Sequence, residues 1–252
     1  MTTILIPLPS RGFDPSEAAI PWKILSNNNI KVVFATPNGK IAHTDEIMLT
    51  GKGLGIWKLA LAARKDAVDA FNEMVDSSEF QNPITYQDIN MGDFDGILLP
   101  GGHDKPVKEY LESTVLQKLI SYFFNVNKPV AAICHGVVLV ARSKNSSTGQ
   151  SVIYKYKTTS LLASQEMLGY NMTRLWMGDY YLTYPEITVE DEVLASIQNK
   201  DNFIKGPFPI LRDDMTHLSR GFVVRDRNYL SARWPGDVYK FATEFVRMLK
   251  KH

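Results

Sequence analysis

The chain of 252 residues is predicted to adopt an α/β fold, with a mainly parallel sheet and helices on both of its faces. The first observation is a series of short apolar runs suited to buried strands, at 3–8, 31–36, 95–99 and 129–133. The second is that stretches with helical spacing separate these runs, as parallel strands joined by crossover helices require. We expect a single domain over residues 1–252, because a chain of this length buries enough apolar surface for one core.

The chain opens with a strand, a helix and a second strand. Thr3–Leu8 is an apolar run that ends at Pro9, and Asp14 is a suitable N-cap for a helix whose first turn contains Pro15. Lys31–Thr36 then provides the second strand, so this opening is a βαβ unit whose strands run in parallel.

Two segments interrupt the alternation and are interpreted as insertions. Near 51–80, three glycines provide a flexible entry, and Trp57–Met74 then has the pattern of one amphipathic helix. This insertion is a candidate lid over a site or, in a homodimer, a candidate interface. The second insertion, near 169–209, is rich in Tyr and Trp and is expected to be irregular.

The alternation continues between and after these insertions. The predicted elements are a strand at 95–99, a helix at 107–125, a strand at 129–133, a helix at 137–142, a hairpin formed by 222–225 and 229–232, and a closing helix at 241–249. The strand at 129–133 is apolar throughout, so we expect it in the centre of the sheet.

Composition excludes several classes of function. A formal net charge of +1 leaves no basic footprint for nucleic acid or an anionic membrane, so we expect neither as a partner. The single cysteine excludes an intrachain disulfide, and no apolar stretch approaches the roughly 18 residues that span a bilayer. The first residues lack the pattern of a signal peptide, so we expect a soluble, cytoplasmic protein. No spacing of histidines and acids suggests a metal site, and we expect no cofactor.

Cys134 is the predicted reactive residue. It directly follows the strand at 129–133, and Gly136 allows the chain to turn sharply into the next helix. Such an elbow presents a nucleophile above the carboxyl edge of a sheet, where α/β proteins hold their ligands. The start of the helix, a hydrogen bond from a protonated Glu17 and an imidazolium at His135 would each favour a thiolate, so we expect an exposed Cys134 with a pKa in the range of roughly 4–7. The alternative is a small buried core residue, as free cysteines often are.

Neighbouring residues are candidates for the rest of the site. His135 follows the thiol and is the candidate base, with a solvent-facing turn histidine as the alternative. Gly101 and Gly102 follow the preceding strand and are predicted to direct N–H groups at an oxyanion, together with the His135 amide. His103 comes next in the chain and is a candidate for the pocket wall.

These motifs together resemble the ThiJ/PfpI superfamily, whose members resemble class I glutamine amidotransferase domains. Leu99–Gly102, a strand end followed by Pro-Gly-Gly, precedes the Ala-Ile-Cys-His-Gly of Ala132–Gly136 by about thirty residues. Glu17, at the start of the first helix, is similar to the family's glutamate that hydrogen-bonds the cysteine. Ser231–Asp237 is similar to the family's late strand, turn and helix. The resemblance covers most of the chain and implies a flavodoxin-like three-layer sandwich.

The resemblance also implies a site and a set of activities. Members include intracellular peptidases or amidases, glyoxalase III enzymes, proteins described as deglycases and a stress chaperone branch. The two insertions place this chain nearer the large chaperone-like and glyoxalase-like branch. That glyoxalase branch has an aspartate about thirty residues after the cysteine. Glu166 is the only acid in this region here, with its register off by about one residue, and is the candidate third catalytic residue.

The leading hypothesis is a cysteine-dependent hydrolase or glyoxalase III-type enzyme that attacks a small carbonyl or amide substrate through Cys134. The alternatives are a stress chaperone without catalysis and a redox sensor that uses oxidation of the Cys134 thiol. A glutaminase is disfavoured, because such domains need a late His-x-Glu pair, and neither His217 nor His252 is part of one.

Overall fold

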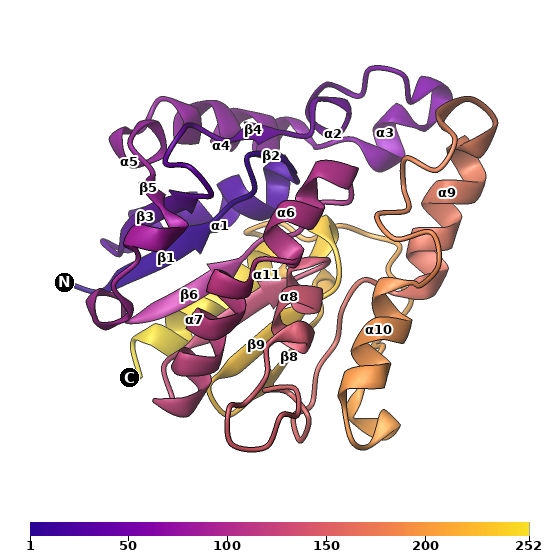
Figure 1. Ribbon diagram of the computed structural model, residues 1–252. Coiled ribbons are helices and arrows are strands. Elements are labelled where there is room, and N and C mark those ends of the chain that lie inside the picture. Colours follow the sequence, from indigo (N-terminus) through magenta and orange to yellow (C-terminus); the bar gives the residue numbers. More distant parts are fainter. Residues whose placement is uncertain (252) are drawn as a thin grey trace.

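A seven-stranded sheet lies at the centre of the molecule, with helices on both sides (Figure 1). The computed structural model describes residues 1–251 of the chain. The strands are β1 Thr3–Pro7, β3 Lys31–Thr36, β5 Ile84–Thr85, β6 Gly96–Leu99, β7 Val130–Ile133, β8 Val223–Asp226 and β9 Tyr229–Ala232. They are ordered β5-β3-β1-β6-β7-β9-β8, and every neighbouring pair is parallel except β8 and β9. The predicted α/β fold with a mainly parallel sheet is therefore confirmed.

The order of the strands determines where a ligand can be held. β3 and β6 lie on opposite sides of β1, so the winding of the chain reverses at β1. At such a switch point the loops after the strands diverge and leave a crevice at the carboxyl edge of the sheet. β1, β6 and β7 are parallel and close together, so the segments that follow Pro7, Leu99 and Ile133 meet at this edge.

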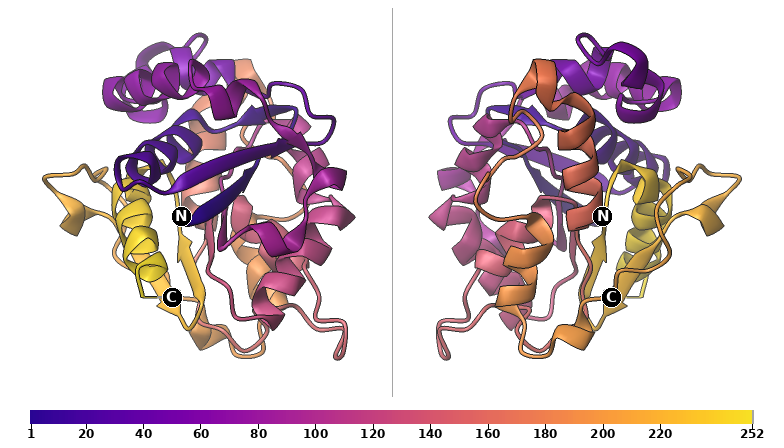
Figure 2. Two further views of the ribbon diagram at one scale, coloured as in Figure 1. Left: turned by 90° about the vertical axis from the view of Figure 1, so that its left-hand side faces the viewer. Right: turned by 90° about the vertical axis from the view of Figure 1, so that its right-hand side faces the viewer.

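Both faces of the sheet are covered, because its strands are apolar on both sides. Ile4 and Ile6 of β1 point into one core, and Leu5 points into the other. The first core is closed by α1 Pro15–Asn27, α4 Lys65–Val75 and α11 Val238–Leu249, and the second by α6 Lys108–Leu111, α7 Thr114–Asn125, α8 Gly136–Arg142 and α10 Val189–Ser196. Figure 2 shows these helical layers on either side of the sheet, which confirms the predicted three-layer arrangement.

The first predicted insertion contains several short helical segments instead of one long helix. They are a 3₁₀ turn at Gly55–Trp57, α3 Lys58–Leu61, α4, and α5 Ser78–Gln81. The single helix predicted for Trp57–Met74 is wrong, because the chain is extended at Ala62 and Arg64. The guanidinium of Arg212 donates to the carbonyl oxygens of residues 60–62. In a continuous helix these oxygens would accept from backbone amides instead.

The second predicted insertion is more regular than expected. α9 Ala163–Met177 begins before residue 169, and α10 follows it, so the irregular chain lies between and after these two helices. α9 lies beside α3 (Figure 1), and the indole nitrogen of Trp176 donates to the Gly53 carbonyl at 2.8 Å. The two insertions therefore meet above the carboxyl edge of the sheet.

Other elements differ from prediction in detail. The helix predicted at 107–125 is divided into α6 and α7, because Ser113 caps a new helix at Thr114. The hairpin of β8 and β9 and the closing helix α11 are present as predicted. A small parallel sheet of β2 Arg11–Phe13 and β4 His43–Thr44, followed by α2 Glu46–Thr50, was not predicted. None of the helices within residues 1–251 has the length and apolar character needed to cross a membrane.

A buried ion pair holds the turn that follows β9. Arg233 and Asp237 are both almost fully buried, and Nε of the arginine lies 2.9 Å from Oδ2 of the aspartate. Nη1 of Arg233 also donates to the carbonyls of Lys205 and Pro207. The guanidinium therefore ties a distant loop to the turn that carries Trp234 toward the carboxyl edge.

The turn after β7 requires a glycine at position 136. A Cβ atom placed on Gly136 would lie 2.3 Å from the Leu99 carbonyl oxygen and 2.8 Å from that of Pro100. These oxygens belong to the backbone at the end of β6, where Leu99 is paired with Ala132 of β7. Gly136 therefore allows α8 to begin in close contact with β6.

We expect Gly136→Ala to lower the free energy of unfolding by about 1–3 kcal/mol, because the added methyl group overpacks against fixed backbone. Urea unfolding of the variant and the wild type gives the difference. Gly92→Ala is the matched control, since the nearest atom to its added Cβ is 3.7 Å away. The control should change the free energy by less than about 0.5 kcal/mol. Equal losses in the two variants would show that the contact with β6 is not tight.

Candidate active site

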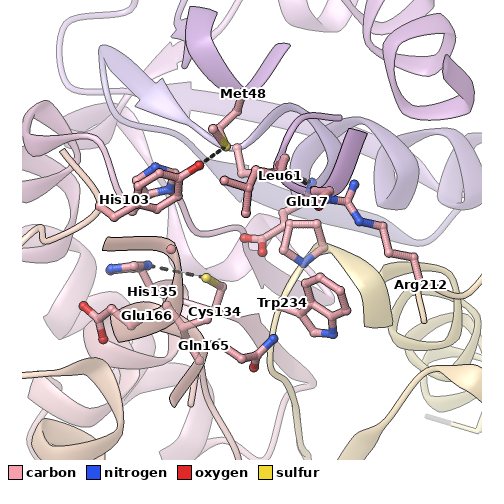
Figure 3. A pocket seen from close by; sticks show the side chains of 17 residues that line it. Glu17, Met48, Leu61, His103, Cys134, His135, Gln165, Glu166, Arg212 and Trp234 are labelled. Atoms are coloured by element: carbon pink, nitrogen blue, oxygen red, sulfur yellow. Dashed lines mark hydrogen bonds between the residues drawn. The ribbon is translucent and has the colours of Figure 1, made fainter. Parts of the chain in front are cut away.

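A pocket opens at the carboxyl edge of the sheet, where β1, β6 and β7 end (Figure 3). Its volume is about 650 Å³, including the part that is open to solvent. The lining residues are Asp14, Glu17, Met48, Ala60, Leu61, Gly102, His103, Cys134, His135, Leu161, Gln165, Glu166, Gly169, Tyr181, Arg212, Trp234 and Pro235. All of the site residues predicted from the sequence, except Gly101, are in this set.

Cys134 lies on the sharp turn between β7 and α8. Its φ of 56° is in the left-handed region, which a residue with a Cβ atom adopts only when the surroundings enforce it. The Cys134 amide donates to the Ala232 carbonyl of β9 at 3.1 Å, which holds the turn at the edge of the sheet. The side chain is only 7% exposed, so the exposed position predicted for it is wrong. The physical reason is that residues of α3 and α9 form walls above the turn.

His135 turns its imidazole back toward the thiol. Nδ1 lies 3.4 Å from the Cys134 sulfur, and Nε2 lies 3.1 Å from the hydroxyl oxygen of Thr183. The alternative of a solvent-facing histidine is excluded, because His135 is fully buried. Burial lowers the pKa of His135 to about 3, so the imidazole is neutral at neutral pH.

Thr183 belongs to the site, although the sequence analysis missed it. It lies in the irregular stretch between α9 and α10, and its hydroxyl donates to the His103 carbonyl at 2.7 Å. The residues around it carry no motif that marks a functional threonine. Its contact with His135 forms only because the chain after α9 folds back over the sheet edge.

Glu17 reaches the thiol from the first turn of α1. Asp14 caps this helix by accepting from the amides of Ser16 and Glu17, which confirms the predicted N-cap. Oε2 of Glu17 accepts from the Gly101 amide at 2.8 Å, and Oε1 has no hydrogen-bond partner of good geometry within residues 1–251. Burial raises the pKa of this carboxyl well above its usual value. The contact with the Cys134 sulfur lowers the pKa, but by a smaller amount. The raised pKa favours the protonated form of Glu17.

Burial also raises the pKa of the Cys134 thiol well above its usual value. The His135 amide, which faces the sulfur, lowers the pKa by less than burial raises it. The acidic pKa predicted for the thiol is therefore wrong, because loss of hydration outweighs the hydrogen bond that favours a thiolate. The resting site thus holds a thiol, a neutral imidazole and a protonated carboxyl group.

The amides around the sulfur are used differently from the prediction. The Gly101 amide is occupied by Glu17, so its predicted role as an oxyanion donor is wrong. The Gly102 amide donates to no protein acceptor in the described part of the chain, and a Cβ at this position would lie 2.4 Å from the Gly12 carbonyl oxygen. The His135 amide faces the sulfur. These two amides are the candidates for an oxyanion hole.

His103 forms one wall of the pocket within a group of aromatic side chains. Its ring stacks on Tyr181 with centroids 4.5 Å apart and meets the Tyr180 ring at 4.8 Å in an edge contact. Nε2 of His103 lies 3.9 Å from a carboxylate oxygen of Asp45. The stacking fixes the orientation of the imidazole, and the Thr183 hydroxyl fixes its backbone.

Glu166 lines the same pocket, and among the described residues it forms no hydrogen bond with His135. Its carboxylate accepts from the Val189 amide at 2.9 Å, and burial raises its pKa to about 7. The position beside Nε2, which a third residue of a Cys–His pair takes, is held by Thr183 instead. Within residues 1–251, no group of three or more His, Cys, Asp or Glu side chains has an arrangement suited to a metal ion.

Two further pocket residues were also missed by the sequence analysis. Arg212 comes from a loop far along the chain and supports α3 by donating to the carbonyls at its end. Gln165 lies on the first turn of α9, inside a helix whose start was not predicted. Both depend on how the insertions fold over the sheet, for which local sequence carries no signal.

Comparisons with known proteins agree with this architecture. Residues 8–207 match the model of a family described as ThiJ/PfpI family-like. A glutathione-independent glyoxalase of Schizosaccharomyces pombe is 29% identical over 163 residues, which make up 63% of this chain and 63% of that protein. A deglycase of Pyrococcus abyssi is 24% identical over 171 residues, or 66% of this chain and 69% of that protein. The chain thus spans less than two thirds of the length of the yeast glyoxalase.

A solved structure supports the fold over the whole chain. Glyoxalase III from Candida albicans superposes with a TM-score of 0.67 at 17% sequence identity, covering 98% of this chain and 97% of that one. At this level of identity the likeness extends to the fold alone. The family model, by contrast, matches most of the sequence, including the elbow at Cys134. The protein therefore belongs to the ThiJ/PfpI family.

Proposed function

We propose that this protein is a glyoxalase III-type enzyme that uses Cys134 to convert a small 2-oxoaldehyde into the corresponding 2-hydroxy acid. The observation that carries the proposal is the 3.4 Å separation between the Cys134 sulfur and Nδ1 of the neutral His135. A neutral imidazole at this distance can accept the thiol proton as the sulfur attacks a carbonyl carbon. The glyoxalase and deglycase relatives support the substrate class.

The first step forms a hemithioacetal. The sulfur bonds to the aldehyde carbon, the thiol proton moves to Nδ1 of His135, and the carbonyl π electrons move onto oxygen. The amides of Gly102 and His135 donate to this oxygen while it carries negative charge. The oxygen then takes the proton from His135, so the base returns to its neutral form.

The second step moves two electrons within the substrate. A base removes the hydrogen from the former aldehyde carbon, and the neighbouring carbonyl oxygen takes up the negative charge and a proton to give an enediol. A proton is then added to the neighbouring carbon while the hydroxyl on the former aldehyde carbon loses its proton, which leaves a thioester of the 2-hydroxy acid. Water cleaves the thioester and restores the thiol, so the net reaction consumes one water and needs no external oxidant. Glu166 is the proposed proton carrier, because a pKa of about 7 lets it both donate and accept near neutral pH.

Other functions make different demands on the same residues. An amidase would use the same thiol and amides, with His135 protonating the leaving amine. A chaperone would not need the thiol, and a redox sensor would be oxidised at Cys134 without turnover. Substitution of the cysteine therefore separates the chaperone from the functions that need the thiol, and turnover of a 2-oxoaldehyde separates the glyoxalase from the amidase and the redox sensor.

We expect the wild type to convert methylglyoxal to lactate, and Cys134→Ala to lose this activity by at least about 10³-fold, because the nucleophile is removed. Steady-state lactate formation measures the effect, and urea unfolding verifies that the variant is folded. Gly92→Ala is the control for activity, since its surroundings are open and remote from the pocket. Turnover that persists in Cys134→Ala would contradict the proposal. A chaperone would be favoured if the wild type shows no turnover and if the wild type and Cys134→Ala suppress the aggregation of other proteins equally well.

The protonated state of Glu17 has a consequence for stability. The folded protein keeps the Glu17 proton, whereas the unfolded chain loses it above about pH 4.5, so stability from this site falls as pH rises. Glu17→Gln keeps an oxygen for the Gly101 amide and cannot ionise. We therefore expect Glu17→Gln to gain stability relative to the wild type as pH rises, by at most about 1.4 kcal/mol per pH unit.

Urea unfolding of both proteins at about pH 5 and about pH 8 measures this change, because the other titrating groups are common to both and cancel. The expected result is a difference in unfolding free energy that moves in favour of Glu17→Gln at the higher pH. A difference that is the same at both pH values would mean that Glu17 is ionised in the folded protein.

A further inference from the structure

The hydroxyl of Thr183 lies between the backbone carbonyl of His103 and the imidazole of His135. Its oxygen is 2.7 Å from the His103 carbonyl oxygen and 3.1 Å from Nε2 of His135, and both Thr183 and His135 are fully buried. A carbonyl oxygen only accepts, so the single hydroxyl proton of Thr183 is donated to His103. Toward His135 the hydroxyl oxygen therefore presents only its lone pairs, so it can only accept a hydrogen bond from the imidazole.

The direction of this bond determines which nitrogen of His135 carries the hydrogen. A neutral imidazole has one N–H group and one nitrogen with a free lone pair. Because the Thr183 oxygen can only accept from His135, the hydrogen is on Nε2. Nδ1 then has the free lone pair, and it lies 3.4 Å from the Cys134 sulfur.

The opposite tautomer would leave Nε2 of His135, a buried acceptor, without a donor. Nε2 and the Thr183 oxygen would then both be acceptors, facing one another at 3.1 Å. If the hydroxyl proton turned toward Nε2 instead, the His103 carbonyl would lose its donor. An unsatisfied buried polar group costs about 1–3 kcal/mol, which is enough to keep one tautomer dominant.

We propose that Thr183 is a positioning residue, which fixes the Nε2–H tautomer of His135 and so keeps Nδ1 ready to accept the Cys134 thiol proton. The inference deepens the proposed function, on which its catalytic consequence rests. A hydroxyl in this position orients the imidazole but carries no charge. It therefore differs from a carboxylate, which would also stabilise an imidazolium.

The tautomer itself is measurable without any substrate. Protein labelled with ¹⁵N-histidine contains five such residues, and the His135 signals are assigned by their loss in His135→Gln. Long-range ¹H–¹⁵N correlation spectra distinguish a protonated ring nitrogen from an unprotonated one. We expect His135 in the wild type to show an unprotonated Nδ1 and a protonated Nε2 between about pH 5 and 8. A protonated Nδ1 would overturn the proposal.

Substitutions of Thr183 test its role. Thr183→Val removes the acceptor and leaves an Nε2–H group unpaired, so the Nδ1–H tautomer should predominate, and methylglyoxal turnover should fall at least about 10-fold in kcat with little change in KM. Thr183→Ser should restore both the tautomer and the turnover. Thr173→Val is the matched control, because Thr173 is also fully buried and donates to a backbone carbonyl, that of Gly169, away from His135. The control should keep the wild-type tautomer and turnover.

The outcomes separate the two proposals. A wild type with the expected tautomer but no turnover would refute the proposed function and leave the role of Thr183 intact. Thr183→Val with the wild-type tautomer and full turnover would refute the role of Thr183 alone. If Thr183→Val does not fold, the spectrum of the wild type still decides which nitrogen carries the hydrogen.

Discussion

The site depends on the left-handed turn at Cys134. A residue with a Cβ atom at a φ of 56° costs about 1–3 kcal/mol and persists only where packing enforces it. Here the enforcing contacts are the Cys134 amide, which is bonded to β9, and the close approach of Gly136 to the end of β6. Because the turn is held from both neighbouring strands, the sulfur is directed into the crevice that Glu17 and His135 also reach.

Burial controls the chemistry of the groups at this turn. Removal from water disfavours every charged form, so it raises the pKa of Glu17 and of Cys134 and lowers that of His135. The three groups are therefore neutral together in the resting protein, which explains how a nucleophile can lie at the floor of a mostly apolar pocket. Charge develops only when a substrate accepts the attack, and the Gly102 and His135 amides are available to meet it.

Local pattern was sufficient for the elbow and for every strand of the main sheet except the short β5, because each is encoded in a short stretch of sequence. The apolar run before Cys134 and the glycine after it predicted the strand-to-helix turn. What covers the turn depends on contacts between distant segments. Thr183 lies 48 residues after His135. α3 ends where the guanidinium of Arg212 donates to its carbonyl oxygens. The burial of Cys134, and with it the direction of its pKa, therefore required the tertiary structure.

The pH dependence of Cys134 alkylation by iodoacetamide tests the central claim most directly, namely that the resting site holds a neutral thiol. Cys134 is the only cysteine in the sequence, so the reaction reports on this residue alone. Because burial raises the pKa of the thiol, we predict a rate that keeps increasing with pH and has its midpoint above that of an ordinary cysteine. A rate that is already constant at neutral pH, with an acidic midpoint, would show a resting thiolate and contradict this account.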